Sequence, residues 1–564
     1  MYTMSLRLKL IFATCCLFLG VGVLYPIGWL IFRSFYTPGA GLSWDYWRQG
    51  LQSPFLFSAL RNTLIISISA SFITSVLGGA LGFLSAKTDV PAKGLLRLTA
   101  LSPFLISQSV MAVAWVLLAE GNGGLLNVLL RRMGSPITLE IFSLPGIIFT
   151  TVLLLLPMTF VVVEGLARNL NIELEEAAFT CGASHTYTLR HIILPLLLPG
   201  LTALGLLCLM LSNVMFSVQG ILGQPKNIWT LATLIYFTLN SYPINIATAM
   251  SMAIILLGTG AILLAGQQRL LSHSDIHSIV GKYRDAKPWR LSSRSKATFC
   301  VLIVGLFLLF VALPYGALLF RSLARYDVQV RGGWGQMVMG MNLDAYRKAF
   351  SDPAMVRGLL HSLVLAVSTA GFCVMLSFIM GYWVFRTQLP GRHWVHIVCV
   401  TPFAFSGMIL GLAFILAFSG RPLSLYGTLW ILLFGYIIRE LGIAFKVVQA
   451  SLAQIPRSLE ESAFVCGSSA VYMARRILLP LMAPSLWGVA LLIFLAAFRE
   501  VESSVLLSGP GIEVFGYNIF IGFQNGTWKE VSAMAIVAAA VCTMATAAVA
   551  LLLRFQLSKK EAQV

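Results

Sequence analysis

Long apolar segments follow one another along the whole chain, and they constrain its fold more than any other feature. A helix that crosses a bilayer needs about 20 mainly apolar residues, because backbone groups facing lipid must be hydrogen-bonded within the segment. Twelve segments meet this requirement, at roughly 10–32, 60–86, 95–119, 141–163, 193–216, 245–266, 298–320, 359–385, 394–418, 424–448, 480–499 and 531–555. The sequence therefore predicts an all-α polytopic membrane protein.

Composition agrees with a membrane protein and argues against a set of soluble domains. Of 564 residues, 58% are hydrophobic and only 11% are charged, whereas soluble domains carry about 25% charged residues. The net charge of +18 does not indicate nucleic-acid binding, because the basic residues are divided among the loops between apolar segments. Basic residues in such loops report topology.

The distribution of Lys and Arg predicts that both termini face the cytoplasm. The first apolar segment is longer than the apolar region of a signal peptide and lacks a small-x-small cleavage site, so we expect it to stay as a helix. The nine cysteines include no C-x-x-C pair, which argues against a disulfide framework and a zinc site. The sequence does not identify the ligands of any metal site.

One motif occurs twice, and its two copies are 285 residues apart. Residues 176–182 read EAAFTCG and are followed after nine residues by IILP, while residues 461–467 read ESAFVCG and are followed after nine residues by ILLP. The same offset aligns Glu175 with Glu460. Upstream, Lys87-Thr88 and Arg386-Thr387 match at an offset of 299. The first half therefore has 14 extra residues, which we place between Glu120 and Glu140.

These matches divide the chain into two parallel repeats of six helices. The predicted boundaries are 1–266 for the first repeat, 267–297 for a polar and basic cytoplasmic linker, and 298–564 for the second repeat. Each repeat carries its motif between its fourth and fifth helices, on the cytoplasmic side.

Both copies of the motif resemble the EAA loop of permease subunits in binding-protein-dependent ABC importers. The family pattern is E-A-A, three residues, G, nine residues, I-x-L-P, and the only departure is Ser462 in place of the first Ala. In that family the loop forms two short cytoplasmic helices that dock into a cleft on the ATPase subunit. The resemblance implies the following docking residues: Glu175, Glu176, Ala177, Ala178, Gly182, Glu460, Glu461, Ser462, Ala463 and Gly467.

The residue types suit a docking role. Gly182 and Gly467 each separate two stretches that favour helix, where a turn with positive φ needs a residue without Cβ. The small side chains let a partner surface approach closely, and Glu176 and Glu461 offer a charge to a basic partner residue. E-A-A is also ordinary helix composition, but two copies in the same register argue against coincidence.

The chain has no G-x-x-x-x-G-K-[ST] phosphate loop, so we do not expect it to be an enzyme or to bind ATP itself. The resemblance implies two copies of an ABC ATPase subunit, which would carry the only cofactors, ATP and Mg²⁺. It also implies a periplasmic substrate-binding protein, which the outer stretches 34–59 and 322–357 would face. The expected location is the bacterial inner membrane.

Five positions inside or next to apolar segments are charged in the second repeat and uncharged in the first. Arg439, Glu440, Arg499, Glu500 and Glu502 correspond to uncharged residues of the first repeat. Charges in lipid are costly and are expected to be paired or turned inward. Two interpretations remain open: the glutamates line a route for a cationic substrate, or the five residues form a buried ion-pair network that fixes helix orientation.

The stretch from Phe498 to Gly511 resembles the second half of the fused permeases of ferric iron importers. Carboxylate oxygens suit a hard cation such as Fe³⁺, and ferric iron is therefore the first substrate hypothesis. Similar chains import thiamine or aminoethylphosphonate, and a polyamine is a further alternative. A secondary transporter driven by an ion gradient also has repeats and intramembrane charges, but it would not need two docking loops.

Overall fold

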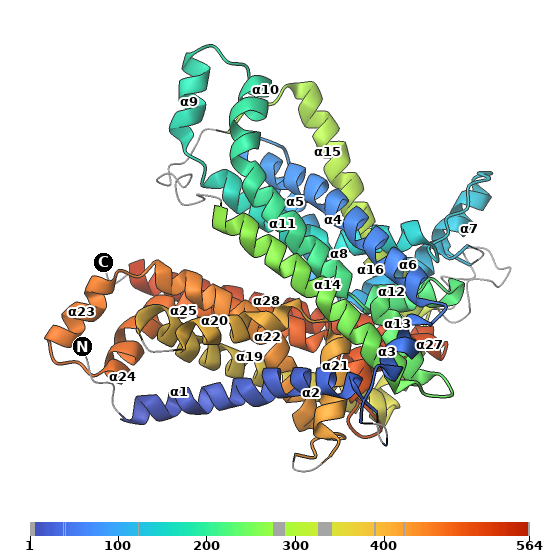
Figure 1. Ribbon diagram of the computed structural model, residues 1–564. Helices are drawn as coiled ribbons and strands as arrows, with labels where there is room; N and C mark the ends of the chain where they lie inside the picture. Colours follow the sequence, from blue (N-terminus) through green and yellow to red (C-terminus); the bar gives the residue numbers. More distant parts are fainter. Residues whose placement is uncertain are drawn as a thin grey trace. The chain divides into compact units, whose positions relative to one another are not determined.

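The computed structural model describes residues 6–37, 39, 41–121, 123–273, 288–324, 341–388, 391–420 and 423–561. These residues are almost entirely helical, which confirms the all-α class (Figure 1). The strands among them are β1 (Tyr36–Thr37) and β2 (Gly41–Leu42), which pair antiparallel. Residues 274–287 of the expected linker and residues 325–340 of the outer stretch 322–357 lie outside the described residues.

The chain forms two compact units, and each contains segments that are distant in sequence. Unit 1 comprises Met1–Gln49, Ala349–Ile521 and Val537–Val564, while unit 2 comprises Gly50–Lys348 and Gly522–Ile536. The leading helices of each repeat thus belong to the unit built mainly from the other repeat. The predicted boundaries at 267 and 297 divide the chain according to its sequence repeat. The compact units divide the chain differently, so these boundaries stay a prediction.

The helices of unit 1 are α1 (Leu6–Leu19), α2 (Tyr25–Ser34), α19 (Pro353–Arg386), α20 (Arg392–Val400), α21 (Gly407–Phe418), α22 (Leu429–Ala453), α23 (Arg457–Val465), α24 (Ala470–Met473), α25 (Leu479–Phe498) and α26 (Ser504–Leu507). The helices of unit 2 are α4 (Leu56–Lys87), α5 (Lys93–Leu101), α6 (Gln108–Ala119), α7 (Leu125–Arg132), α8 (Leu144–Arg168), α9 (Ile172–Thr180), α10 (His185–Thr188), α11 (Leu194–Val214), α12 (Ser217–Gly223), α13 (Leu231–Asn240), α14 (Ile246–His273), α15 (Ser293–Phe307) and α16 (Leu313–Leu323). The division between the units passes through or next to α3 (Asp45–Leu51), α18 (Asp344–Ser351), α27 (Phe515–Gln524) and α28 (Trp528–Glu561).

In the described part of the chain, four short π-helical segments occur at matched places, and each ends two residues before a proline. They are Gly20–Leu24, Leu189–Ile193, Leu308–Ala312 and Ala474–Leu478, before Pro26, Pro195, Pro314 and Pro480. Proline has no N–H to donate to the preceding turn, so the helix widens locally and the N–H before the proline bonds five residues back. In the first segment, for example, the Tyr25 N–H donates to the Gly20 carbonyl.

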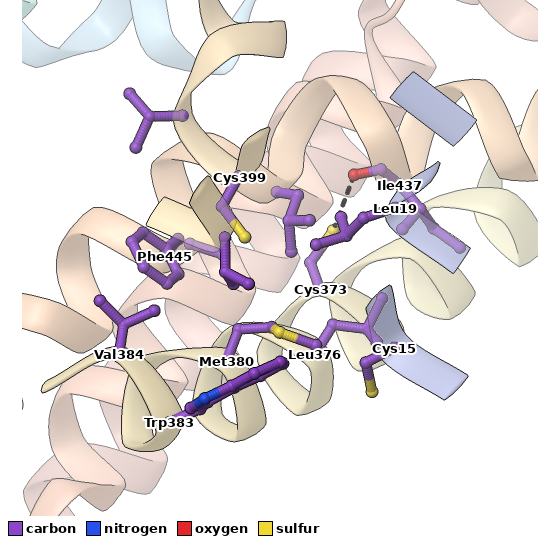
Figure 2. Close-up of a cluster of buried hydrophobic side chains, with 14 of the residues drawn as sticks. Cys15, Leu19, Cys373, Leu376, Met380, Trp383, Val384, Cys399, Ile437 and Phe445 are labelled. Carbon is purple, nitrogen blue, oxygen red and sulfur yellow. Dashed lines mark hydrogen bonds between the residues drawn. The ribbon is translucent and has the colours of Figure 1, made fainter. Parts of the chain in front are cut away.

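The core of unit 1 forms where α1 lies against α19 and α22. Figure 2 shows Cys15 and Leu19 of α1 beside Cys373 and Leu376 of α19, all buried. In the same cluster the Cys373 thiol donates to the Ile437 carbonyl of α22 at 3.5 Å. The first helix of the chain is therefore part of the core of this unit.

In unit 2, α4 packs closely along α8 through small residues. A Cβ added to Gly78 would lie 2.6 Å from the Cβ of Thr159, and one added to Gly82 would lie 2.8 Å from the carbonyl oxygen of Phe160. These two positions are the small-x-x-x-small face that permits close helix contact in lipid. Larger side chains there would push the two helices apart.

The expected count of twelve spans is not confirmed. Within the described ranges nine helices are long and apolar enough to cross a membrane, or ten if one bent pair counts as a span. That pair takes the place of the expected span 95–119, and the chain bends by 109° between Lys93–Leu105 and Gln108–Ala119. Pro103 lies in the 3₁₀ turn at the bend, and the Ser107 hydroxyl accepts the Val110 N–H to begin α6.

The other two expected spans depart from the prediction for two different reasons. Segment 394–418 divides into α20 and α21 around Pro402, as its counterpart divides around Pro103. Segment 424–448 forms α22, which is 25 residues long but carries Arg439, Glu440 and Lys446. Its charges, rather than its length, set it apart from the nine apolar helices.

The extra residues of the first repeat form a local structure around α7. Between α6 and α8 the chain runs from Glu120 to Ser143, whereas α21 and α22 are joined by the shorter stretch 419–428. The buried Asn127 amide donates to the carbonyls of Glu120 and Leu139, and its oxygen accepts the Leu139 N–H. The predicted position of the insertion therefore agrees with the helix boundaries.

Candidate functional site

Each copy of the motif forms two short helices at one end of its unit. Docking loop 1 is the segment from α9 through α10, and docking loop 2 is the segment from α23 through α24. In Figure 1, α9 and α10 stand at the end of unit 2, and α23 and α24 lie at the end of unit 1 where α1 begins. The two loops have the same internal construction.

Glycine forms the turn within each loop. Gly182 has φ +81° and Gly467 has φ +80°, which is the left-handed region. In loop 1 the N–H of Gly182 donates to Phe179 and that of Ala183 to Ala178; the corresponding bonds exist in loop 2. This is the Schellman arrangement, in which a residue without Cβ ends the first helix at no steric cost. The predicted turn role of both glycines is confirmed.

Glu175 of docking loop 1 and its counterpart Glu460 of docking loop 2 are buried, and each is paired inside its own unit. Glu175 forms an ion pair with Lys87 at the end of α4. Glu460 forms one with Arg386 at the end of α19, where Nε and Oε1 are 2.9 Å apart. All four side chains are at most 8% exposed. These glutamates fix their loops to long helices and offer little surface to a partner.

The remaining docking residues lie mainly on the exposed side of the loops. Glu176, Ala177 and Gly182 are exposed in loop 1, as are Glu461, Ser462 and Gly467 in loop 2. Ala178 is buried and Ala463 is half-buried. The helical period thus separates an inner face that holds the loop from an outer face that is exposed.

Large apolar side chains are also exposed at matched positions of the two loops. Leu174 and Leu459 are 46% and 45% exposed, and Tyr187 and Tyr472 are 54% and 59% exposed. Each tyrosine follows a serine N-cap, since Ser184 and Ser469 accept the tyrosine N–H at 3.3 Å. The same construction therefore presents the same leucine and tyrosine on both loops.

Sequence reasoning missed the role of Lys87 and Arg386. They were used only to align the repeats and to infer topology, although matched basic residues at the ends of matched helices were a usable signal. Arg386 does more than pair with Glu460: its Nη2 donates to the carbonyls of Leu452 and Ile455. It thereby joins the ends of α19 and α22 to docking loop 2.

Four of the five charged residues predicted in the second repeat meet in unit 1, and Arg439 is at the centre. Its Nη1 donates to Glu500 Oε1 at 2.6 Å and its Nη2 to Glu502 Oε2 at 2.8 Å. Glu440 lies farther away, with 3.8 Å between its Oε1 and Arg439 Nε. The three glutamates are at most 6% exposed. The arrangement is an ion-pair network between α22 and the segment that follows α25.

Glu500 and Glu502 are held by further hydrogen bonds. Glu500 accepts the N–H groups of Ser503 and Ser504, and Glu502 accepts the N–H of Gly407 at 3.3 Å. A Cβ on Gly407 would collide with Arg439, so the absence of a side chain there admits the guanidinium. These two carboxylates are largely saturated by protein donors.

Arg499, the fifth residue, donates from Nε to the Leu495 carbonyl at 2.8 Å. No group of three or more His, Cys, Asp or Glu side chains that could hold a metal ion occurs in the part of the chain that the structure describes. The predicted passage of substrate along these glutamates stays a prediction.

Comparisons with known proteins agree on one family. Residues 75–274, which include docking loop 1, match the model for "Binding-protein-dependent transport system inner membrane component". A ferric transport system permease protein, FbpB, of Actinobacillus pleuropneumoniae is 23% identical over 492 residues, 86% of this chain and 69% of that one. A putative FbpB of Haemophilus influenzae is 23% identical over 87% of this chain and 77% of that one.

A shorter relative matches about half of the chain. The putative 2-aminoethylphosphonate transport system permease protein PhnV of Salmonella paratyphi A is 27% identical over 256 residues, which are 44% of this chain and 92% of that one. These relatives are transport permeases. Residues 75–274 therefore match the family of binding-protein-dependent transport system inner membrane components, and the chain resembles the ferric transport permeases.

Proposed function

We propose that this permease is the membrane subunit of an ATP-driven importer, and that its two docking loops each engage one copy of an ABC ATPase subunit. The observation that carries the proposal is the repeated exposure of the same leucine and tyrosine on both loops. Apolar surface at a loop that faces water is unfavourable until a partner covers it. Two equivalent surfaces on one chain suit two copies of one partner.

The orientation follows from the same proposal. ATP is cytoplasmic, so both docking loops and both termini face the cytoplasm, in agreement with the distribution of Lys and Arg in the loops. The chain has no phosphate loop, and the ATPase partner supplies the ATP and Mg²⁺ chemistry. A substrate-binding protein delivers cargo at the opposite face, as the family description of binding-protein-dependent transport suggests.

Ferric iron is the substrate that we propose. The two ferric transport permeases match this chain over 86% and 87% of its length, whereas the aminoethylphosphonate permease matches 44%. Iron is cargo here and needs no resident site in the chain. Aminoethylphosphonate is the second candidate because a relative bears that name, and thiamine and polyamines remain weaker alternatives.

Glu440 is the charged residue that we propose for the substrate route. Glu500 and Glu502 are bound to Arg439 and to backbone N–H groups, so a passing cation would have to displace them. Among the described residues Glu440 has one ion pair, with Arg439, and its Oε1 lies 3.8 Å from Arg439 Nε. Its carboxylate is therefore the easiest of the three to redirect.

Uptake into proteoliposomes tests the proposed function. The permease, its ATPase and its binding protein are reconstituted, and uptake of ⁵⁵Fe³⁺ is compared with uptake of labelled 2-aminoethylphosphonate, with and without internal ATP. The proposal expects iron uptake that requires ATP. Uptake that persists without ATP and follows an ion gradient would instead support a secondary transporter, and aminoethylphosphonate uptake alone would change the substrate.

A further inference from the structure

Residues 288–290, where the described chain resumes after the linker, run beside the end of α4. The Trp289 N–H donates to the Lys87 carbonyl at 2.8 Å, and the Asp89 N–H donates to the Trp289 carbonyl at 3.1 Å. The resulting bridge pairs Thr88 with Trp289 in parallel. Two segments about 200 residues apart in sequence are thus joined by backbone hydrogen bonds.

Side chains extend this contact to the first turn of α15. Asp89 accepts the Leu291 N–H at 2.8 Å and pairs with Lys296 Nζ at 2.7 Å. The hydrogen bond from Lys296 and that from the Leu291 N–H hold the pKa of Asp89 below its ordinary value. The carboxylate is therefore charged throughout the physiological pH range, and the link between α4 and α15 persists there.

The Trp289 ring lies against docking loop 1. Its centroid is 4.9 Å from that of His185 and 6.1 Å from that of Phe179, which belong to the two helices of the loop. It is also 5.6 Å from Phe83 of α4. The ring planes are steeply inclined to one another, an arrangement that is favourable for aromatic pairs.

The apolar cluster beneath the ring includes both ends of docking loop 1. Its buried members are Leu170, which precedes α9, and Ile193 and Leu197, which follow α10, and Trp289 packs on them. Lys87 completes the junction, because its carbonyl holds Trp289 and its ammonium group pairs with Glu175. Docking loop 1, α4 and the segment leading into α15 are therefore bonded to one another.

From these contacts we infer that Trp289 is a positioning residue that couples docking loop 1 to α15, the first helix of the second repeat. A force applied to the loop reaches α4 through Glu175 and α15 through Trp289. The inference rests on the proposed function for the source of that force, the ATPase subunit. The coupling itself is a property of the permease alone.

Hydrogen–deuterium exchange of the purified full-length permease tests the coupling without any ATPase. In Trp289→Ala the backbone of 172–188 should exchange about tenfold faster, because local opening loses its aromatic contacts. Exchange of docking loop 2, residues 457–473, should not change. Trp289→Phe should lie between Trp289→Ala and the natural protein, since it keeps an aromatic ring. Trp394→Ala is the matched control, because Trp394 is 71% exposed in α20.

A second measurement, in the reconstituted importer, tests whether transport depends on the contact of Trp289 with docking loop 1. Trp289→Ala should increase the ATP hydrolysed per substrate imported about threefold or more, as a loosened transmission element would, while Trp394→Ala should not. Unchanged exchange of 172–188 in Trp289→Ala, or equal acceleration in both docking loops, would overturn the inference. If Trp289→Ala does not accumulate in the membrane, the same comparison is made with Trp289→Phe and Asp89→Asn. Hydrogen–deuterium exchange is measured on the permease alone. Its result therefore shows whether Trp289 couples docking loop 1 to α15 even if ATP-driven import fails.

Discussion

Arg386 and Lys87 stand at matched helix ends, and each holds the buried glutamate of a docking loop. They are not equivalent, because the guanidinium of Arg386 also binds two carbonyls at the end of α22. A lysine offers one compact charge and cannot make that set of contacts. Single residues thus determine how firmly each loop is held.

Replacing Arg386 with Met should release docking loop 2. Breaking a buried ion pair from one side costs about 3–5 kcal/mol, because the remaining charge is buried without a partner. Arg386→Met should therefore lower the thermal unfolding temperature in detergent. Adding Glu460→Gln should restore part of it, and Arg386→Lys should lie between Met and the natural residue. Equal stability of Arg386→Met and the double variant would contradict this account.

The defect of Arg386→Met should depend on pH. Burial raises the pKa of Glu460, and Arg386 opposes that effect, so removing Arg386 should raise the pKa further. A carboxyl group whose pKa is raised by folding favours the folded state at low pH and opposes it as pH rises through that pKa. The stability difference from the natural protein should therefore be larger at pH 8 than at pH 5. A difference that is constant over this range would count against the buried pair.

The charge cluster around Arg439 allows a comparison between two glutamates. Glu500→Gln removes a partner at 2.6 Å and should lower stability by about 3 kcal/mol, with less protein in the membrane. Glu440→Gln removes only the contact at 3.8 Å, so expression and unfolding temperature should stay normal while uptake falls. Membrane protein level, unfolding and uptake are measured for both variants. Normal uptake by well-expressed Glu440→Gln would remove Glu440 from the proposed route.

The docking loops are the elements that the sequence predicted best. The turns at Gly182 and Gly467 followed from a repeated motif with a glycine at a fixed place, and the two-helix form followed from the resemblance of that motif to the EAA loop. The separation of buried Glu175 from exposed Glu176 did not follow, because the motif alone does not give the direction of each side chain. The helical period makes adjacent residues face differently, and only the position of α4 decides which one is buried.

Substituting the two glycines tests whether the loop turn matters in each repeat. No atom lies within 4 Å of a Cβ built on Gly182 or Gly467, so the cost of Ala is the left-handed backbone alone, about 1–2 kcal/mol. Gly182→Ala and Gly467→Ala should each reduce the affinity for the ATPase subunit. Asn tolerates this conformation better and should reduce it less. The affinity is measured by titrating the permease with the ATPase subunit. Equal affinities of the Ala and Asn variants would contradict the account.

The spans were predicted less well than the loops. Apolar composition identified all nine long helices, but it also joined α5 with α6 and α20 with α21. The Ser-Pro and Thr-Pro pairs at positions 102–103 and 401–402 were visible signals of a break. Trp289 carried no signal, because its partners are distant in sequence and become neighbours only when the linker returns to the end of α4.

At the scale of the molecule, the repeats and the compact units are different divisions of the chain. α1 and α2 pack in unit 1 with helices of the second repeat, and α15 and α16 pack in unit 2 with helices of the first. Sequence similarity between the halves could not reveal this exchange, because similarity records what is repeated and not what it packs against.

The exchange predicts how the chain behaves when it is divided. Segments 1–273 and 288–564 expressed separately should not accumulate, since each lacks the leading helices that complete its larger unit. Expressed together they should assemble and co-purify, because the exchanged helices bury apolar surface between them. Membrane fractionation and co-purification through a tag on one segment measure both outcomes. Stable accumulation of segment 1–273 alone would show that unit 2 folds without α15 and α16 of the second repeat.

The central claim is that both docking loops of one permease hold ATPase subunits, and native cysteines allow it to be measured directly. Cys181 and Cys466 are exposed at matched positions of the two loops, whereas the other seven cysteines are buried or partly buried. A bifunctional cross-linker attached to these thiols is applied to the complex of permease and ATPase, and the products are identified by mass spectrometry. The account predicts that each of the two cysteines becomes linked to an ATPase subunit, with two ATPase copies per permease chain. Cross-links from only one loop, or from neither in an assembled and active complex, would contradict it.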